Sequence, residues 1–170
     1  MLKEVVARWC GLDKDLKGLR QRVEELSWDS AYGMWTRSAI LQFCQVLPRS
    51  RRTVVFIDLD RIHVLNNELG YTAVDARIQA SFSSISLRRS DLVARWYSGD
   101  EIVILFDSDR PFANSKIAEL QQSAKAQGLT FTYAVGEWEV GKESVEEVVK
   151  ELADRIVTEK PQRRSVSETP

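Results

Sequence analysis

Two short acidic stretches hold the side chains best suited to chemistry. Asp58 and Asp60 lie in the apolar run FIDLD, and Asp100 and Glu101 lie in YSGDEI, directly before another apolar run. Carboxylates gathered at the end of a buried strand repel one another, and an isolated buried carboxylate takes up a proton instead of staying charged. Because a divalent cation holds several such groups ionised together, the pattern predicts a site for a metal ion and a phosphate group.

The apolar patterns around these acids predict the elements that must position them. β-branched and aromatic runs predict strands, the second and third forming a hairpin, at residues 53–57, 92–96, 102–106 and 129–135. Helical periodicity predicts helices at residues 38–47, 62–69, 73–87, 112–127 and 144–160. We expect Pro48 and Pro161 to end the first and the last of these helices. No low-complexity linker divides the elements, so the sequence predicts one α/β or α+β domain.

The first 27 residues repeat apolar side chains at alternating intervals of three and four. The repeat consists of Leu2, Val5, Trp9, Leu12, Leu16, Leu19, Val23 and Leu26. This spacing is typical of a coiled-coil seam, and opposite charges at facing positions, such as Arg8 and Asp13, favour a parallel dimer. A single helix packed on its own domain is the alternative.

Length and charge limit the classes of function. The chain has 170 residues, with 24 Lys and Arg against 25 Asp and Glu, which suits one domain without a basic footprint for long nucleic acid. No apolar run approaches the roughly 18 residues of a membrane span. Cys10 and Cys44 lack the spacing of a metal site, so we expect free thiols and a soluble, cytoplasmic protein.

Further motifs recur in a fixed order along the chain. They are Asp29, Gly33 and Arg37; FIDLD; Asn66, Gly70 and Asp75; SGDEI at 98–102; AVG at 134–136; and Ala153 with Asp154. In order and spacing they resemble the GGDEF family of diguanylate cyclases, which join two GTP molecules into cyclic di-GMP. The likeness covers about residues 29–160.

The resemblance implies a fold and a division of the chain. The fold is α+β, with a ferredoxin-like βαββαβ nucleotidyl-cyclase core, extra helices and an N-terminal coiled-coil helix. Residues 1–28 would be a dimerisation and signalling helix, residues 29–160 the GGDEF domain, and residues 161–170 a flexible tail.

The resemblance also implies a metal site and a catalytic pair. Asp58, Asp100 and the main-chain carbonyl of Leu59 would bind Mg²⁺ or Mn²⁺, which prefer oxygen ligands. Asp100, with Glu101 beside it, would accept the proton of an attacking ribose 3′-hydroxyl or bridge the metal ions.

Other matched positions would bind the substrate GTP. Asn66 and Asp75 would hold guanine, because Asp accepts from its N1 and N2 donors. Alternatively, Asn66 could cap a local turn and Asp75 could cap a helix that begins at Ala76. The residues expected near the phosphates are His63, where lysine is common in the family, Gly99, Lys160 and Arg164. Lys160 and Arg164 could equally be an exposed, solvated charge cluster.

The resemblance also implies a second site, at the segment from Arg88 to Asp91. This segment has the pattern RxxD and matches the family's product-inhibition site for cyclic di-GMP, although such a tetrapeptide is common by chance.

The hairpin differs from the family in length. Between Arg95 and Ser98 the chain has one residue more than the family, so we expect a β-bulge that re-aims Asp100.

The favoured function is therefore a diguanylate cyclase acting as a homodimer through its N-terminal helix. The alternative is a degenerate, non-catalytic GGDEF domain that binds GTP or cyclic di-GMP as a regulatory module, which His63, Ile102 and the extra hairpin residue favour. A cyclase making another dinucleotide is a third interpretation, against which the guanine pair argues.

Overall fold

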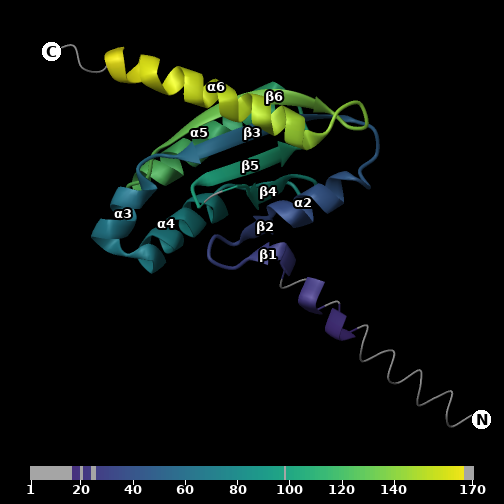
Figure 1. Cartoon of the computed structure of the whole chain (residues 1–170), viewed down its shortest axis with the longest axis horizontal. Coiled ribbons are helices and arrows are strands. Elements are labelled where there is room, and N and C mark those ends of the chain that lie inside the picture. The colour runs from purple at the N-terminus through teal and green to yellow at the C-terminus, as the bar shows by residue number, and fades with distance from the viewer. Residues whose placement is uncertain (1–16, 20, 24–25, 98, 167–170) are drawn as a thin grey trace, which may run out of the picture.

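A six-stranded sheet organises the part of the chain that the computed structural model describes, which is residues 17–166 without 20, 24–25 and 98. Helices cover both faces of this sheet (Figure 1). Its strands, in the spatial order β1-β2-β4-β5-β3-β6, are β1 (Trp28–Asp29), β2 (Met34–Thr36), β4 (Leu92–Arg95), β5 (Glu101–Phe106), β3 (Arg51–Leu59) and β6 (Phe131–Glu139). The helices are α2 (Arg37–Cys44), α3 (Ile62–Leu69), α4 (Tyr71–Ser83), α5 (Arg110–Ala126) and α6 (Val145–Val166). Beyond residue 158 only the backbone of α6 is described.

Strand β3 lies in the interior of the sheet, antiparallel to both β5 and β6. Its residues from Val54 to Ile57 are buried on both faces, which explains why they form an uninterrupted apolar run. The strand becomes partly exposed only at Asp58, where it reaches the end of the sheet.

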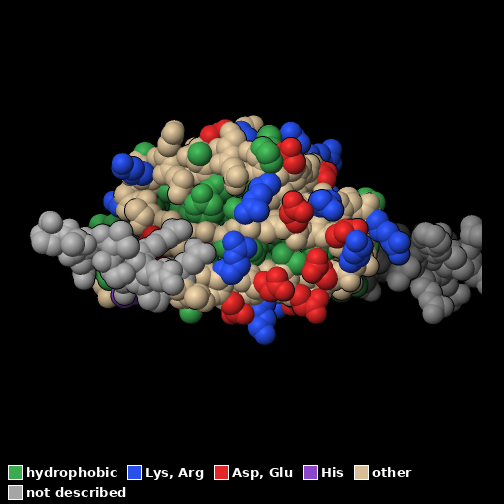
Figure 2. Space-filling model, turned by 90° about the horizontal axis from the view of Figure 1, so that it is seen from above, with side chains coloured by type: hydrophobic (Ala, Val, Ile, Leu, Met, Phe, Trp, Pro, Cys, Tyr) green, Lys and Arg blue, Asp and Glu red, His purple; other side chains and the backbone are tan. Residues whose placement is uncertain are grey.

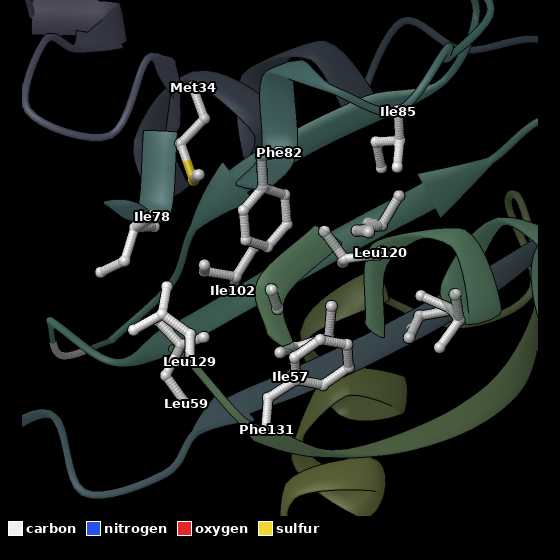
Figure 3. Packing of buried hydrophobic residues seen from close by; sticks show 14 of the residues in the cluster. Met34, Ile57, Leu59, Ile78, Phe82, Ile85, Ile102, Leu120, Leu129 and Phe131 are labelled. Atoms are coloured by element: carbon white, nitrogen blue, oxygen red, sulfur yellow. The ribbon is translucent and has the colours of Figure 1, made fainter. Parts of the chain in front are cut away.

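Side chains of β3 alternate between two hydrophobic cores. Ile57 and Leu59 belong to the core under α4 and α5, where Phe82, Ile102 and Phe131 converge (Figure 3). Phe56 belongs to the other core, under α2 and α6. Because successive strand residues point to opposite faces, Asp58 shares the face that α2 and α6 cover.

The mixed α+β fold class and the hairpin of β4 and β5 are confirmed, while several boundaries differ from the prediction. Helix α4 spans Tyr71–Ser83, not 73–87. Beyond it, the Ser84 hydroxyl donates to the Ser81 carbonyl at 2.8 Å. Serine hydroxyls that bond nearby main chain compete with helix continuation.

The predicted end of the last helix at Pro161 is wrong, because α6 continues to Val166. A proline removes a single main-chain donor, and a helix can continue past it with a local distortion. Residues 161–166 of the predicted flexible tail therefore belong to α6, and 167–170 lie outside the described residues.

The N-terminal segment leaves the sheet at β1. Residues 17–19, 21–23 and 26–27 are helical and run away from the domain (Figure 1). The rest of the predicted coiled coil, residues 1–16 with 20 and 24–25, lies outside the described residues. Within the described part of the chain, no helix has the length and apolar character needed to cross a bilayer.

Candidate active site

The end of β3 and the tip of the β4–β5 hairpin lie side by side. Asp58 is the cross-strand partner of Glu101, and the main-chain N–H of Leu59 donates to the carbonyl of Asp100 at 2.8 Å. Directly opposed residues of neighbouring strands point to the same face, with their Cβ atoms about 5 Å apart. The two acidic stretches of the sequence therefore meet at one end of the sheet, with all four of their acids partly exposed.

The extra hairpin residue is accommodated in the loop. The β4–β5 pairing is regular from Leu92 opposite Leu105 to Arg95 opposite Ile102, and the Trp96 N–H continues it by donating to the Glu101 carbonyl at 2.8 Å. The predicted β-bulge is therefore wrong, because the ladder stays in register and the additional residue lengthens the connection beyond it.

One side of this loop is held by Tyr32. The Tyr32 hydroxyl donates to the carbonyl of Gly99, and the guanidinium of Arg95 lies 4.4 Å from the Tyr32 ring centroid. Arg95 also bonds Asp29 at 2.8 Å, and Asp29 accepts from the N–H of Tyr32 at 3.1 Å. The β1–β2 turn is thereby tied to the hairpin loop.

Burial and charge set the protonation of these groups. Burial raises the pKa of Tyr32 to about 12, so its hydroxyl remains a hydrogen-bond donor at neutral pH. Burial alone would raise the pKa of Asp29, but the hydrogen bonds from Arg95 and from the Tyr32 N–H hold that pKa below its usual value. A charged Asp29 with a charged Arg95 is the stable pairing.

The other side of the loop is held by Arg37, the first residue of α2. Its guanidinium carbon lies 4.7 Å from the Tyr97 ring centroid and 5.3 Å from that of Trp96. Arg37 also forms an ion pair with Glu146 in the first turn of α6. Trp96 is 4% exposed and Tyr97 is 55% exposed, so one aromatic ring anchors the loop while the other covers the arginine.

The predicted guanine pair lies on two consecutive helices joined at Gly70. Asn66 is in α3, and its Oδ1 atom is buried without a hydrogen-bond partner among the described residues. Asp75 is inside α4, so the alternative that it caps a helix at Ala76 is wrong. The negative charges of Asp75 and Asp100 both contribute to the raised pKa of Tyr32, the residue that contacts the hairpin loop.

The residues predicted to contact the phosphates lie in three different parts of the structure. His63 is an exposed residue of α3. A Cβ atom at Gly99 would lie 3.0 Å from the Arg95 guanidinium, so this glycine makes room for that arginine. Lys160 and Arg164 lie on the last turns of α6, which extend toward the α3 side of the molecule (Figure 1), and their side chains lie outside the description.

The RxxD segment is occupied by internal bonds. Asp91 is 8% exposed, and its two carboxylate oxygens accept from the N–H groups of Arg88 and Asp107, each at 2.9 Å. The Arg88 guanidinium lies over the Phe112 ring, 4.0 Å from its centroid. Asp91 thus closes a turn and joins it to the end of β5.

Oxygen atoms dominate the end of the sheet, which suits Mg²⁺ or Mn²⁺. The described residues contain no group of three or more His, Cys, Asp or Glu side chains arranged to hold a metal ion. A site here would use two carboxylates, Asp58 and Asp100, with main-chain oxygen and substrate phosphate completing it. Magnesium is commonly bound in that way, through one or two carboxylates plus phosphates.

The two residues that the sequence analysis missed are Tyr32 and Arg95. Tyr32 lies inside the Asp29 to Arg37 motif, and Arg95 is the last residue of β4 before the loop. Their positions within or beside motifs were the only indication of a role in the site. Their contacts could not be predicted, because the bond between Arg95 and Asp29, for example, joins residues 66 positions apart.

The surface carries both signs of charge. On the face covered by α6, Lys and Arg side chains lie among Asp and Glu side chains (Figure 2).

Comparison with known proteins identifies the class. The family model described as diguanylate cyclase, GGDEF domain, matches residues 37–165. The chain therefore belongs to the GGDEF family. No curated protein sequence gives a significant match.

Solved structures share the fold at low sequence identity. Diguanylate cyclase SiaD from Pseudomonas aeruginosa, crystallised with its activator SiaC, has a TM-score of 0.68 and 20% identity over 95% of this chain and 68% of that one. The coiled coil and GGDEF domain of DgcB from Caulobacter crescentus, in complex with c-di-GMP, has a TM-score of 0.70 and 15% identity over 93% and 95%. The S helix-GGDEF-EAL structure of Vibrio cholerae LapD has a TM-score of 0.66 and 14% identity over 90% and 38%.

Proposed function

We propose that this chain is a diguanylate cyclase of the cytoplasm that condenses two GTP molecules into cyclic di-GMP and two pyrophosphates. The observation that supports this most is the contact between Leu59 and Asp100, which brings the first-strand and hairpin acids together in a chain of the GGDEF family. Each copy of a homodimer binds one GTP, because a symmetric reaction suits a symmetric dimer.

The protein's part in the chemistry is to position two substrates and to take a proton. The 3′-oxygen of one GTP attacks the α-phosphorus of the other, the new P–O bond forms, and the bond from that phosphorus to the oxygen bridging the β-phosphate breaks to release pyrophosphate. The same attack by the 3′-oxygen of the second GTP on the first closes the ring and releases the second pyrophosphate. Asp100, with Glu101 beside it, accepts the proton that leaves the 3′-hydroxyl. A Mg²⁺ or Mn²⁺ ion held by Asp58, the Leu59 carbonyl and Asp100 would supply positive charge beside the phosphates.

Guanine selectivity is assigned to Asn66 and Asp75. The unpartnered Oδ1 atom of Asn66 is a buried acceptor that a base donor would satisfy. Asp75 accepts from the N1 and N2 donors of guanine, and adenine lacks that donor pattern. His63, Lys160 and Arg164 are assigned to the phosphates, and Gly99 to the approach beside the loop.

The parts of the chain keep their expected roles in this proposal. Residues 1–28 dimerise and transmit signals, and residues 29–160 form the catalytic domain. The longer hairpin loop favours a second candidate, a domain that binds GTP or cyclic di-GMP without turnover. Ile102 does not support that candidate, because its side chain is fully buried in the hydrophobic core and so packs there instead of contacting a ligand.

Incubation of the purified protein with GTP and Mn²⁺, followed by mass spectrometry, tests the activity. We expect cyclic di-GMP and pyrophosphate, and at least about a hundredfold loss of product in Asp58→Asn and Asp100→Asn, since charge-stabilising groups are typically worth that much. Glu119→Gln, which alters an exposed carboxylate of α5, is the control. GTP binding without product in the unaltered protein would refute the cyclase and support the regulatory module.

A further inference from the structure

Exposed apolar side chains gather where the N-terminal segment joins the sheet. We define the apolar junction surface by Leu26, Trp28, Trp35, Phe43 and Val46, which are between 40% and 76% exposed. Trp28 and Trp35 are cross-strand partners of β1 and β2, with ring centroids 5.4 Å apart in an edge-to-face arrangement. Large contiguous apolar patches on a protein surface mark interaction sites.

The apolar junction surface is also hollowed. Ser27, Trp35, Phe43 and Val46 line a cavity of about 320 Å³ between the chain before β1 and the outer side of α2. A hollow flanked by aromatic rings suits an apolar anchor from a partner, and tryptophan and tyrosine are enriched among the residues that dominate binding energy.

This surface continues the seam of the N-terminal helix. Leu19, Val23 and Leu26 occupy successive seam positions of the heptad pattern and are 58% exposed or more. The helical residues run away from the sheet (Figure 1), so their own domain leaves the seam open to another chain. The seam and the apolar junction surface meet at Ser27.

The geometry of a parallel coiled coil decides which chain can cover the surface. The axes of two such helices lie about 8–10 Å apart, so a seam that continues to Leu26 brings the same segment of the partner beside the chain that leads into the hollow at Ser27. A twofold axis presents the same patch from both copies, which makes the contact self-complementary.

We infer that the apolar junction surface packs against the same surface of a second copy, extending the dimer interface from the N-terminal helix onto β1, β2 and α2. This inference rests on the homodimer of the proposed function. The interface lies next to the loop that holds Asp100, because Thr36 and Arg37 connect β2 to α2 and Arg37 contacts Tyr97.

Sedimentation velocity over a concentration series measures the dimer dissociation constant of the full chain. We expect Phe43→Glu and Val46→Glu each to raise this constant at least about tenfold, since a charge would be buried at the contact. Val157→Glu is the matched control, because Val157 of α6 is 69% exposed against 76% for Val46, and should leave the constant unchanged. Circular dichroism of each variant verifies that it is folded.

Hydroxyl-radical footprinting of Trp35 and Phe43 identifies what covers the surface. Protection that appears only at dimer-forming concentrations supports the inference. A wild-type monomer, an unchanged dissociation constant in both variants, or protection in the monomer by the chain's own residues overturns it. Cyclic di-GMP synthesis is measured separately. If the protein makes no cyclic di-GMP but both variants still weaken the dimer, the proposed function fails and the proposed interface is supported.

Discussion

Two residues that match the family's ligand-binding motifs differ in whether their side-chain oxygens already have hydrogen-bond partners. At Asn66, a buried side-chain oxygen has no partner among the described residues. At Asp91, both carboxylate oxygens already accept main-chain N–H groups. An unmet buried acceptor costs about 1–3 kcal/mol, a cost that a ligand can offset.

The difference shows that a motif match and an available ligand group are separate properties. Asn66 has an atom to offer a nucleotide, so its match supports binding. Each carboxylate oxygen of Asp91 already accepts one main-chain N–H group, and the residue is only 8% exposed, so its match supports a structural role. The hydrogen bonds made within the protein therefore distinguish the two matches, which look equivalent in the sequence.

Asp91→Ala should have the largest effect on stability. It removes the charged acceptor of two main-chain hydrogen bonds, from the N–H groups of Arg88 and Asp107. Because bonds to a charged group contribute about 1.5–3 kcal/mol each, we expect the free energy of unfolding to fall by about 3 kcal/mol in chemical denaturation. Arg88→Ala, which removes only the contact with Phe112, is the comparison and should cost less than about 1 kcal/mol. Equal losses of cyclic di-GMP affinity in both variants, with stability intact, would make RxxD a ligand site instead.

Asn66→Ala should have the opposite profile. We expect kcat/KM for GTP to fall about thirtyfold, or GTP affinity if turnover is absent, because a buried hydrogen bond to the base is lost. The free energy of unfolding should stay the same or rise, since the removed oxygen has no partner among the described residues and its burial cost is relieved. Asn67→Ala, in an exposed position of α3, is the control. A destabilised Asn66→Ala with normal GTP kinetics would contradict the comparison.

Tyr97→Ala tests the support of the hairpin loop. Loss of the ring that covers Arg37 should lower kcat about threefold at unchanged KM, because an exposed cation–π contact is worth about 0.5–1 kcal/mol. Tyr97→Phe keeps the ring and should restore the wild-type rate in steady-state assays. If Phe and Ala behave alike, the ring has no part in positioning Asp100.

The smallest expected effect is a pH dependence from Asp29. Its pKa is lower in the folded protein than its usual 3.8, so its stabilising contribution is complete above about pH 4 and is lost as pH falls through the lower, folded value. Thermal unfolding at pH 6 and pH 3 should show a steeper decline for wild type than for Asp29→Asn. Parallel declines would mean that the bond to Arg95 adds nothing.

The sequence by itself determined the fold class and the locations of the acidic stretches. Residues 53–57 are a short run of β-branched and aromatic residues, which favours a buried strand, and the turn residues at SGDE allow a hairpin. Local patterns could not predict β1 and β2, because strands of two and three residues are too short for a periodic signal.

Tertiary structure decided which of the predicted groups are free to act. Whether Asn66 lacks a partner, whether Asp91 has two, and how Arg37 holds Tyr97 all depend on contacts between distant segments. The extra hairpin residue illustrates the physical reason: the β4–β5 ladder gains more by staying in register than by bulging, so the added residue moved into the loop. Sequence spacing fixes neighbours along a strand, while packing fixes neighbours across the molecule.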